Sequence, residues 1–126
     1  MRPDCKALAA ALDGFGALWR WGDFYGNPAC DGAAEYIAVL DEPTFDGSDD
    51  GELTCCRHSV ALELYDNGGR GAEARRRELS RLLLASGFKH KRAGSVHIPS
   101  ERKHMTAYYL NGWIEEGEAD GRDHRD

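Results

Sequence analysis

The stretch Cys55–Gly87, CCRHSVALELYDNGGRGAEARRRELSRLLLASG, decides the fold because its residue pattern changes period halfway along. Val60, Leu62 and Leu64 alternate with less apolar residues, which is the period-two pattern of a strand with one buried face. Residues 66–69, DNGG, interrupt the alternation, and Asn and Gly tolerate the backbone angles of a tight turn. The first half of the stretch therefore predicts a strand that ends in a turn.

The second half of the stretch predicts an amphipathic helix over Ala72–Ser86. Apolar residues recur there at helical spacing, with arginine and glutamate on the other side. Gly87 suits the left-handed position after a helix. A half-buried strand needs a cover, and this helix is the nearest one. We expect one core cluster between them, made of Val60, Leu62, Leu64, Leu79, Leu82 and Leu83.

The rest of the chain predicts further strands and one more helix. The expected elements are a helix over Arg2–Gly14, a short strand within Ala17–Tyr25, an antiparallel hairpin of Glu35–Leu40 with Glu52–Tyr65, and strands within Phe88–Ile98 and His104–Glu115. The order predicts an α+β fold, with a small mixed or antiparallel sheet covered mainly on one face by two helices. The path from Val60 through the helix to Val96 would be a right-handed βαβ crossover if its two strands are parallel.

Length and composition describe one soluble domain. The chain has 126 residues, 30% of them charged, and a net charge of -6. We expect a single domain over residues 1–115 and a charged, flexible tail over 116–126, because the tail lacks apolar anchors. The acidic balance argues against a sequence-reading DNA binder. The apolar runs are too short to span a membrane, and the N-terminus is interpreted as mature helix and not as a signal peptide.

The cysteines and the acidic connector do not predict a metal site. Cys55 and Cys56 are adjacent in a predicted strand, so their side chains point to opposite faces, and Cys5 and Cys30 have no CxxC partner. We expect reduced, structurally passive thiols. The connector Thr44–Gly51, TFDGSDDG, lacks the ligand spacing of an EF-hand, so a solvated hairpin loop is expected.

The histidines recur at intervals of seven, as His90, His97 and His104. An odd spacing places neighbours on opposite faces of an extended strand, so surface histidines are expected and not a shared metal ligand set. The sequence predicts no metal and no cofactor.

No catalytic motif is recognisable in the chain. There is no phosphate loop, nucleophile elbow or HExxH sequence, and serines beside His58 and His97 have no informative spacing. An enzyme is therefore not expected. The aromatic residues Trp19, Trp21, Phe24 and Tyr25 suggest either a binding platform or rings that cover the edge of the core, and the second interpretation is favoured.

Charge patterning suggests an interface between subunits. A basic zone on the predicted helix and just after it has the opposite sign to the acidic connector, so it can meet that connector in a neighbouring subunit. The interface candidates are Arg75, Arg76, Arg77, Lys89 and Lys91 on the basic side and Asp46, Asp49, Asp50 and Glu52 on the acidic side.

The order of these segments resembles the tail-terminator (tail-completion) proteins of long-tailed bacteriophages and prophages. The matching features are the strand ending in Leu64-Tyr65, the Ala72–Ser86 helix, the turn Ile98–Glu101 in HIPSER, and the aromatic strand Met105–Trp113. The resemblance covers Leu12–Glu115 and rests on pattern and order. The chain departs from the family in the short loop after Pro28, in the Cys55-Cys56 pair and in the charged tail.

The resemblance implies a structural protein of the virion, assembled in the cytoplasm of the host bacterium. Such proteins form a ring, usually a hexamer, that caps the tail tube at its head-proximal end. The implied partners are the tail tube protein, a head-completion or stopper protein of the neck, and genomic DNA that passes through the channel without sequence-specific binding. An acidic protein suits a conduit that must not hold its cargo.

Two other classes of protein remain open. One is a different neck or tail ring component, either a head-tail stopper or a tube protein, and a tube protein should expose a long hairpin and self-polymerise. The other is a small adaptor that binds a host protein through the aromatic patch of Trp19, Trp21, Phe24 and Tyr25, and it should stay monomeric.

Overall fold

The computed structural model describes residues 4–22, 33–47 and 53–116. The helices are α1 (Cys5–Phe15) and α2 (Ala72–Ala85). The strands are β1 (Leu18–Trp21), β2 (Glu35–Asp41), β3 (Thr44–Gly47), β4 (Leu53–His58), β5 (Val60–Asp66), β6 (His90–Arg92), β7 (Val96–Ile98), β8 (Lys103–Leu110) and β9 (Trp113–Glu116). The protein is thus a small α+β domain with two helices and a mixed sheet.

Local signals set the ends of α1. The carboxylate of Asp4 accepts a hydrogen bond from the backbone N–H of Ala7 at 2.7 Å, which caps the first turn. Gly16 ends the helix in the left-handed conformation, with φ at 92°. The helix therefore starts later than the predicted Arg2 and ends one residue beyond Gly14. Its buried side chains, Cys5, Leu8, Ala11, Leu12 and Phe15, share one face.

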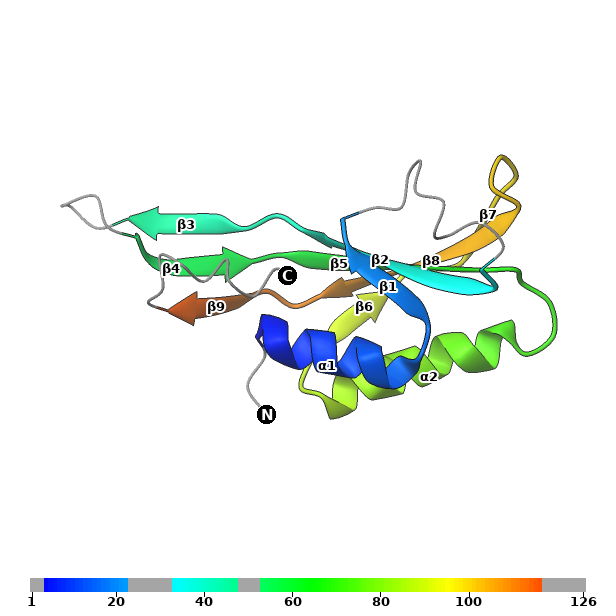
Figure 1. Ribbon diagram of the computed structural model, residues 1–126, viewed down its shortest axis with the longest axis horizontal. Helices are drawn as coiled ribbons and strands as arrows, with labels where there is room; N and C mark the ends of the chain where they lie inside the picture. The colour runs from blue at the N-terminus through cyan, green and yellow to red at the C-terminus, as the bar shows by residue number, and fades with distance from the viewer. Residues whose placement is uncertain (1–3, 23–32, 48–52, 117–126) are drawn as a thin grey trace.

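The main sheet has the strand order β1-β2-β5-β8-β6, with β7 also paired to β8. β1 is parallel to β2, and the other pairs are antiparallel. β5 and β7 each run antiparallel to β8. They therefore run in the same direction, with β8 between them. Figure 1 shows α1 and α2 on the same side of this sheet, so one face is covered by helices and the other is not.

The predicted core forms between the sheet and the helices. Val60, Leu62 and Leu64 are buried on the helix side of β5 and pack in one cluster with Leu79 and Leu83 of α2. Leu82 lies at the margin of the cluster, only partly buried. Tyr108, Phe88 and residues of α1 complete the same core. The predicted strand-turn-helix unit is confirmed.

Two predicted strands are each broken in two, and the breaks create a second sheet. The Glu52–Tyr65 segment divides at Ser59, whose N–H donates to the Asp41 carboxylate at 3.2 Å. The His104–Glu115 segment divides at Asn111 and Gly112, where a Cβ on Gly112 would lie 2.9 Å from the carbonyl oxygen of His58. Beyond the breaks, β3, β4 and β9 form a three-stranded sheet.

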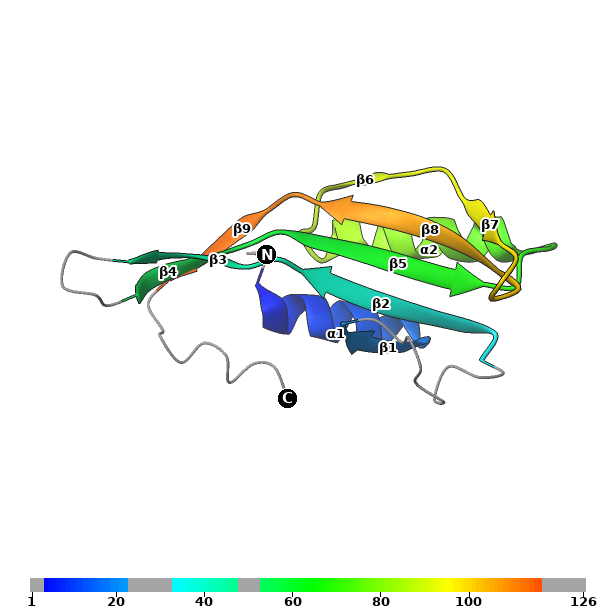
Figure 2. The same ribbon diagram turned by 90° about the horizontal axis from the view of Figure 1, so that it is seen from above.

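This second sheet, called the arm here, projects past the helices at one end of the molecule (Figure 2). The expectation of a solvated loop over Thr44–Gly51 is therefore wrong for its first part, because Thr44–Gly47 is strand β3, paired with β4. Residues 48–51 lie outside the described part of the chain. The sequence predicted one sheet covered by helices, and the structure adds this three-stranded extension to it.

Candidate functional site

The helix-free face of the main sheet carries aromatic and apolar side chains. Tyr36 of β2 and Tyr65 of β5 are directly opposite each other, and their rings stack with centroids 4.8 Å apart. Leu18 pairs with Tyr36 in register and therefore shares this face. Val96 and Tyr109 reach the same face from β7 and β8, and they are 51% and 54% exposed. No described helix covers this surface (Figure 1).

The arm carries exposed apolar side chains as well. Phe45 is 55% exposed, and Ile114 is 38% exposed. Phe45 pairs with Cys56, which pairs with Glu115, so Phe45 lies on the side of the arm that faces the helix layer. Within the described residues, every large exposed apolar side chain except Leu84 of α2 lies on the helix-free face or on the arm. Exposed apolar groups concentrated in this way are typical of protein–protein contacts.

The predicted basic zone is largely used within the chain. Arg75 pairs with Glu35 at 2.6 Å and with Glu78 at 3.2 Å. Arg76 makes a two-pronged contact with Asp66, through Nε and Nη2 at 2.9 Å each. Arg77, 68% exposed, pairs with Glu73 one turn back on α2. Arg75 and Arg76 therefore join α2 to the sheet strands β2 and β5, which the sequence did not reveal.

Lys89 and Lys91 remain exposed on the surface, and Lys91 lies opposite Tyr109 on the helix-free face. Asp46 is in β3, and its side chain is not described. Asp49, Asp50 and Glu52 lie outside the described residues. The pairing of the acidic connector with a neighbour's basic residues stays a prediction, and Lys89 and Lys91 are its best placed basic members.

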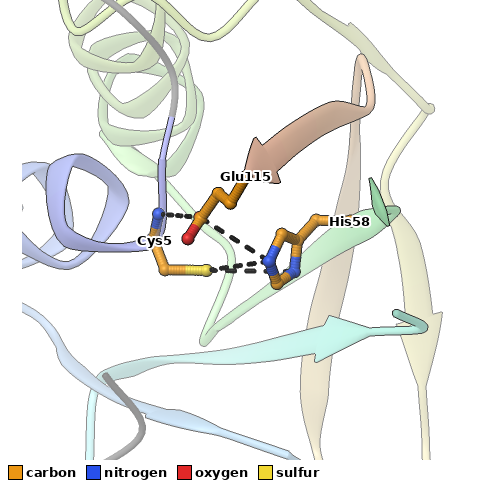
Figure 3. Close-up of side chains that lie close together, drawn as sticks. All are labelled: Cys5, His58 and Glu115. Carbon is orange, nitrogen blue, oxygen red and sulfur yellow. Dashed lines mark hydrogen bonds and ion pairs between the residues drawn. The ribbon is translucent and has the colours of Figure 1, made fainter. Parts of the chain in front are cut away.

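A polar cluster lies where the arm leaves the main sheet, and we call it the junction cluster: Cys5, Asp41, His58 and Glu115. These residues come from α1, β2, β4 and β9. His58 Nδ1 lies 2.6 Å from Asp41 Oδ2, and His58 Nε2 lies 3.6 Å from Glu115 Oε2. Cys5 Sγ lies 3.7 Å from His58 Nε2. Figure 3 shows the side chains of Cys5, His58 and Glu115 pointing toward one another.

Glu115 and His58 are held in place by further contacts. Glu115 Oε2 accepts hydrogen bonds from the Cys5 backbone N–H at 2.8 Å and from Trp113 Nε1 at 3.0 Å. The Trp113 ring stacks on His58 with centroids 5.4 Å apart. The side chains of His58, Asp41 and Glu115 are only 12%, 16% and 19% exposed. The cluster is therefore a fixed and largely buried arrangement.

Its electrostatics follow from these contacts. The hydrogen bond that His58 Nδ1 donates to the Asp41 carboxylate raises the pKa of His58, with burial acting in the opposite direction. Burial raises the pKa of Glu115, but the hydrogen bonds from Trp113 and Cys5 outweigh it and leave that pKa lowered. Burial and the neighbouring Glu115 raise the pKa of the Cys5 thiol. A cysteine nucleophile must be a thiolate, so the cluster is poorly suited to nucleophilic catalysis despite its Cys–His–Asp order.

Sequence reasoning missed this cluster. Cys5 is 53 positions from His58 and 110 from Glu115, and no local motif links them. Cys5, Cys55 and Cys56 form no disulfide among the described residues, and Cys30 lies outside them. One local signal was present: the turn dipeptide Asn111-Gly112 marks the break before β9.

The predicted placement of His90 and His97 on opposite faces of the sheet is not what the structure shows. The rings of His97 and His104 lie 4.9 Å apart in paired strands, and His90 is on the same side of the sheet. The expected alternation of faces is wrong because residues 93–95 separate β6 from β7, so the two histidines do not lie in one continuous strand.

Trp19 and Trp21 pack against the core, in agreement with the favoured interpretation that these rings cover its edge. Phe24 and Tyr25 lie outside the described residues.

Comparison with known proteins identifies no relative of this chain. No protein-family model, no curated protein and no solved structure matches this chain. Within the described ranges, neither helix has the length and apolar character that crossing a bilayer requires.

Proposed function

We propose that the protein is a ring-forming structural component of a phage tail, the terminator that caps the tail tube and joins it to the neck. The proposal starts from the resemblance carried by Leu64-Tyr65, Ala72–Ser86, Ile98–Glu101 and Met105–Trp113. The observation that carries it furthest is the uneven distribution of exposed apolar side chains, on the helix-free face and on the arm.

A head-to-tail contact accounts for both surfaces. A closed ring needs a heterologous interface, in which one surface of each subunit meets a different surface of the next. The arm points away from the body of its own protomer (Figure 2). In the proposed contact, Phe45 of one subunit meets the helix-free face of the next, and both Phe45 and the Tyr109 and Val96 side chains on that face are exposed in the single chain. Burying these side chains removes apolar area from water and favours assembly.

Charge supports the same arrangement. The acidic residues Asp49 and Asp50 follow β3, so they belong to the arm's connector in sequence. Lys91 lies opposite Tyr109 on the helix-free face. These aspartates have the opposite charge to Lys91, so they favour a contact with that face. Each exposed pair contributes only about 0–1 kcal/mol, but several pairs can set the register of the contact.

The test is a tube-capping assay with the tail tube protein encoded by the same phage genome. Tubes grown with the wild-type chain should stop at a ring-capped end, visible by electron microscopy. Phe45→Ser should leave tubes uncapped and of uncontrolled length. Leu84→Ser is the matched control, because Leu84 is also 55% exposed but lies on α2. Tubes that grow identically with and without the wild-type protein would refute the function.

The arm also favours a second candidate, a tube protein, because proteins of that class are expected to expose a long hairpin. A tube protein should also self-polymerise. The two candidates differ in the product of assembly. A terminator forms a closed ring of fixed mass, whereas a tube protein forms an open series of growing length. The mass distribution of the purified chain, measured without other tail proteins, distinguishes the two candidates.

A further inference from the structure

We propose that the junction cluster binds a divalent transition-metal ion of the zinc class, with Cys5 Sγ, His58 Nε2 and a carboxylate oxygen of Glu115 as ligands. One thiolate, one imidazole and one carboxylate form a ligand set that Zn²⁺ accepts in tetrahedral sites, with water in the fourth position. This inference is independent of the ring.

The distances fit an ion at the centre of the three atoms. Bond lengths of about 2.3 Å to sulfur and about 2.0–2.1 Å to nitrogen and oxygen place tetrahedral ligand atoms about 3.4–3.6 Å apart. Cys5 Sγ and His58 Nε2 are 3.7 Å apart, and His58 Nε2 and Glu115 Oε2 are 3.6 Å apart. All three ligand atoms lie within 4.8 Å of one another.

The contacts around the ligands are those of a built site. Asp41 binds His58 Nδ1 at 2.6 Å, and a carboxylate on the outer nitrogen fixes the ring with Nε2 directed inward. Trp113 Nε1 and the Cys5 N–H hold Glu115 in the same way. Cys5 Sγ lies at similar distances from the two ring nitrogens, 3.9 Å from Nδ1 and 3.7 Å from Nε2.

The charge balance favours a dication. Glu115 and Asp41 place negative charge beside a buried sulfur, which disfavours a thiolate alone. A bound cation reverses this effect, because it becomes the largest local charge. Binding replaces the thiol proton of Cys5 by the ion, and that proton leaves to the solvent. The ion would join the start of α1 to β4 and β9, and so fix the arm relative to the helix layer.

The experiment is a Co²⁺ titration of the reduced, metal-stripped full-length protein. A thiolate ligand gives Co²⁺ a near-ultraviolet charge-transfer band, and we expect this band to saturate at one ion per chain. Cys5→Ser should abolish it, while Cys55→Ser, whose residue points to the other face of β4, should keep it. Asp41→Asn should weaken binding by roughly 10–100-fold without loss of the band.

Two results would overturn the proposal: no charge-transfer band in the wild type, or a band that persists in Cys5→Ser. If Cys5→Ser does not fold, Glu115→Gln serves, since it keeps the shape of the side chain. We expect its Co²⁺ affinity to fall at least about tenfold. An unchanged affinity in Glu115→Gln would contradict the assignment equally.

Discussion

Arg76 and Arg77 are neighbours in sequence, yet their surroundings are opposite. The side chain of Arg76 is 11% exposed, and it grips Asp66, which is 7% exposed. Arg77 is 68% exposed and pairs with a glutamate on its own helix. A run of three arginines predicts a basic surface, and no local pattern distinguishes the one that turns inward. The difference depends on where β5 ends relative to α2, which is a tertiary property.

Removing Arg76 should therefore cost far more than removing Arg77. Arg76→Ala leaves Asp66 buried with an unpaired charge, and we expect a loss of roughly 3–5 kcal/mol in the free energy of unfolding. Arg77→Ala removes an exposed pair on the helix surface and should stay within about 0.5 kcal/mol of wild type. Urea denaturation at fixed protein concentration measures both. Equal losses for the two variants would show that the Arg76–Asp66 pair is not a buried, stabilising contact.

The leucines of α2 give a second contrast among residues. Leu83 is fully buried and Leu82 only partly so, although both were predicted to lie in the core. Leu83→Ala should cost about 2–5 kcal/mol, because it leaves a cavity that the surrounding side chains fill only partly. Leu82→Ala should cost clearly less. Chemical denaturation measures the free energy of unfolding of both variants. A larger loss for Leu82→Ala than for Leu83→Ala would mean that α2 is rotated on the sheet.

At the scale of elements, the alternation around Val60 and the helical period after Ala72 were sufficient to predict β5, α2 and the pairing of β2 with β5. The strand breaks at Ser59 and at Asn111-Gly112 were not predictable in this way. Residues on both sides of each break continue to favour extended structure, so their periodicity carries no signal of a bend. Asn111-Gly112 is itself a turn dipeptide, and the expectation of one continuous strand did not use it. The arm and the junction cluster depend on both breaks, and the one at Ser59 has no such local signal.

Glu73 links two elements, α2 and β6, and this link should respond to acid. The hydrogen bond from Arg92, with a further one from Arg77, lowers the pKa of Glu73 from 4.5 to about 2. A lowered pKa in the folded state means that the stabilisation is present above about pH 4.5 and is lost as the pH falls toward 2. Glu73→Gln should remove this part of the acid destabilisation.

Melting temperature as a function of pH tests this prediction. Wild type should lose stability more steeply than Glu73→Gln between pH 4.5 and 2. Glu78→Gln is the control, because it keeps the contacts of Glu73 with Arg92 and Arg77 and should follow the wild-type curve. Parallel curves for wild type and Glu73→Gln would show that the α2–β6 link contributes nothing.

At the scale of the whole molecule, the described residues leave two surfaces with exposed apolar side chains. One is the helix-free face with Tyr109 and Lys91, and the other is the arm with Phe45. The sequence predicted opposite charges on the subunit contact, with basic partners both on the helix and just after it. Since Arg75 and Arg76 have carboxylate partners within the protomer, the expected contact shifts to Lys89 and Lys91.

A charge exchange tests this contact. Asp49→Lys with Asp50→Lys should weaken assembly, because it places like charges against the lysines of the neighbouring subunit. Adding Lys89→Glu and Lys91→Glu should partly restore assembly, and raising the salt concentration should reduce the difference. The oligomer fraction measured by light scattering gives the result. Full assembly of the double-lysine variant would exclude the acidic connector from the interface.

The most direct test of the proposed ring is the native mass of the purified chain. We predict a single closed oligomer, a hexamer, for the wild type and for Leu84→Ser, and a shift to monomers for Phe45→Ser and for Tyr109→Ser. The three variants should keep the far-ultraviolet circular dichroism of the wild type, since the substituted side chains are exposed. A wild-type protein that stays monomeric at every concentration, or that forms an open series of masses without a closed state, would contradict the ring.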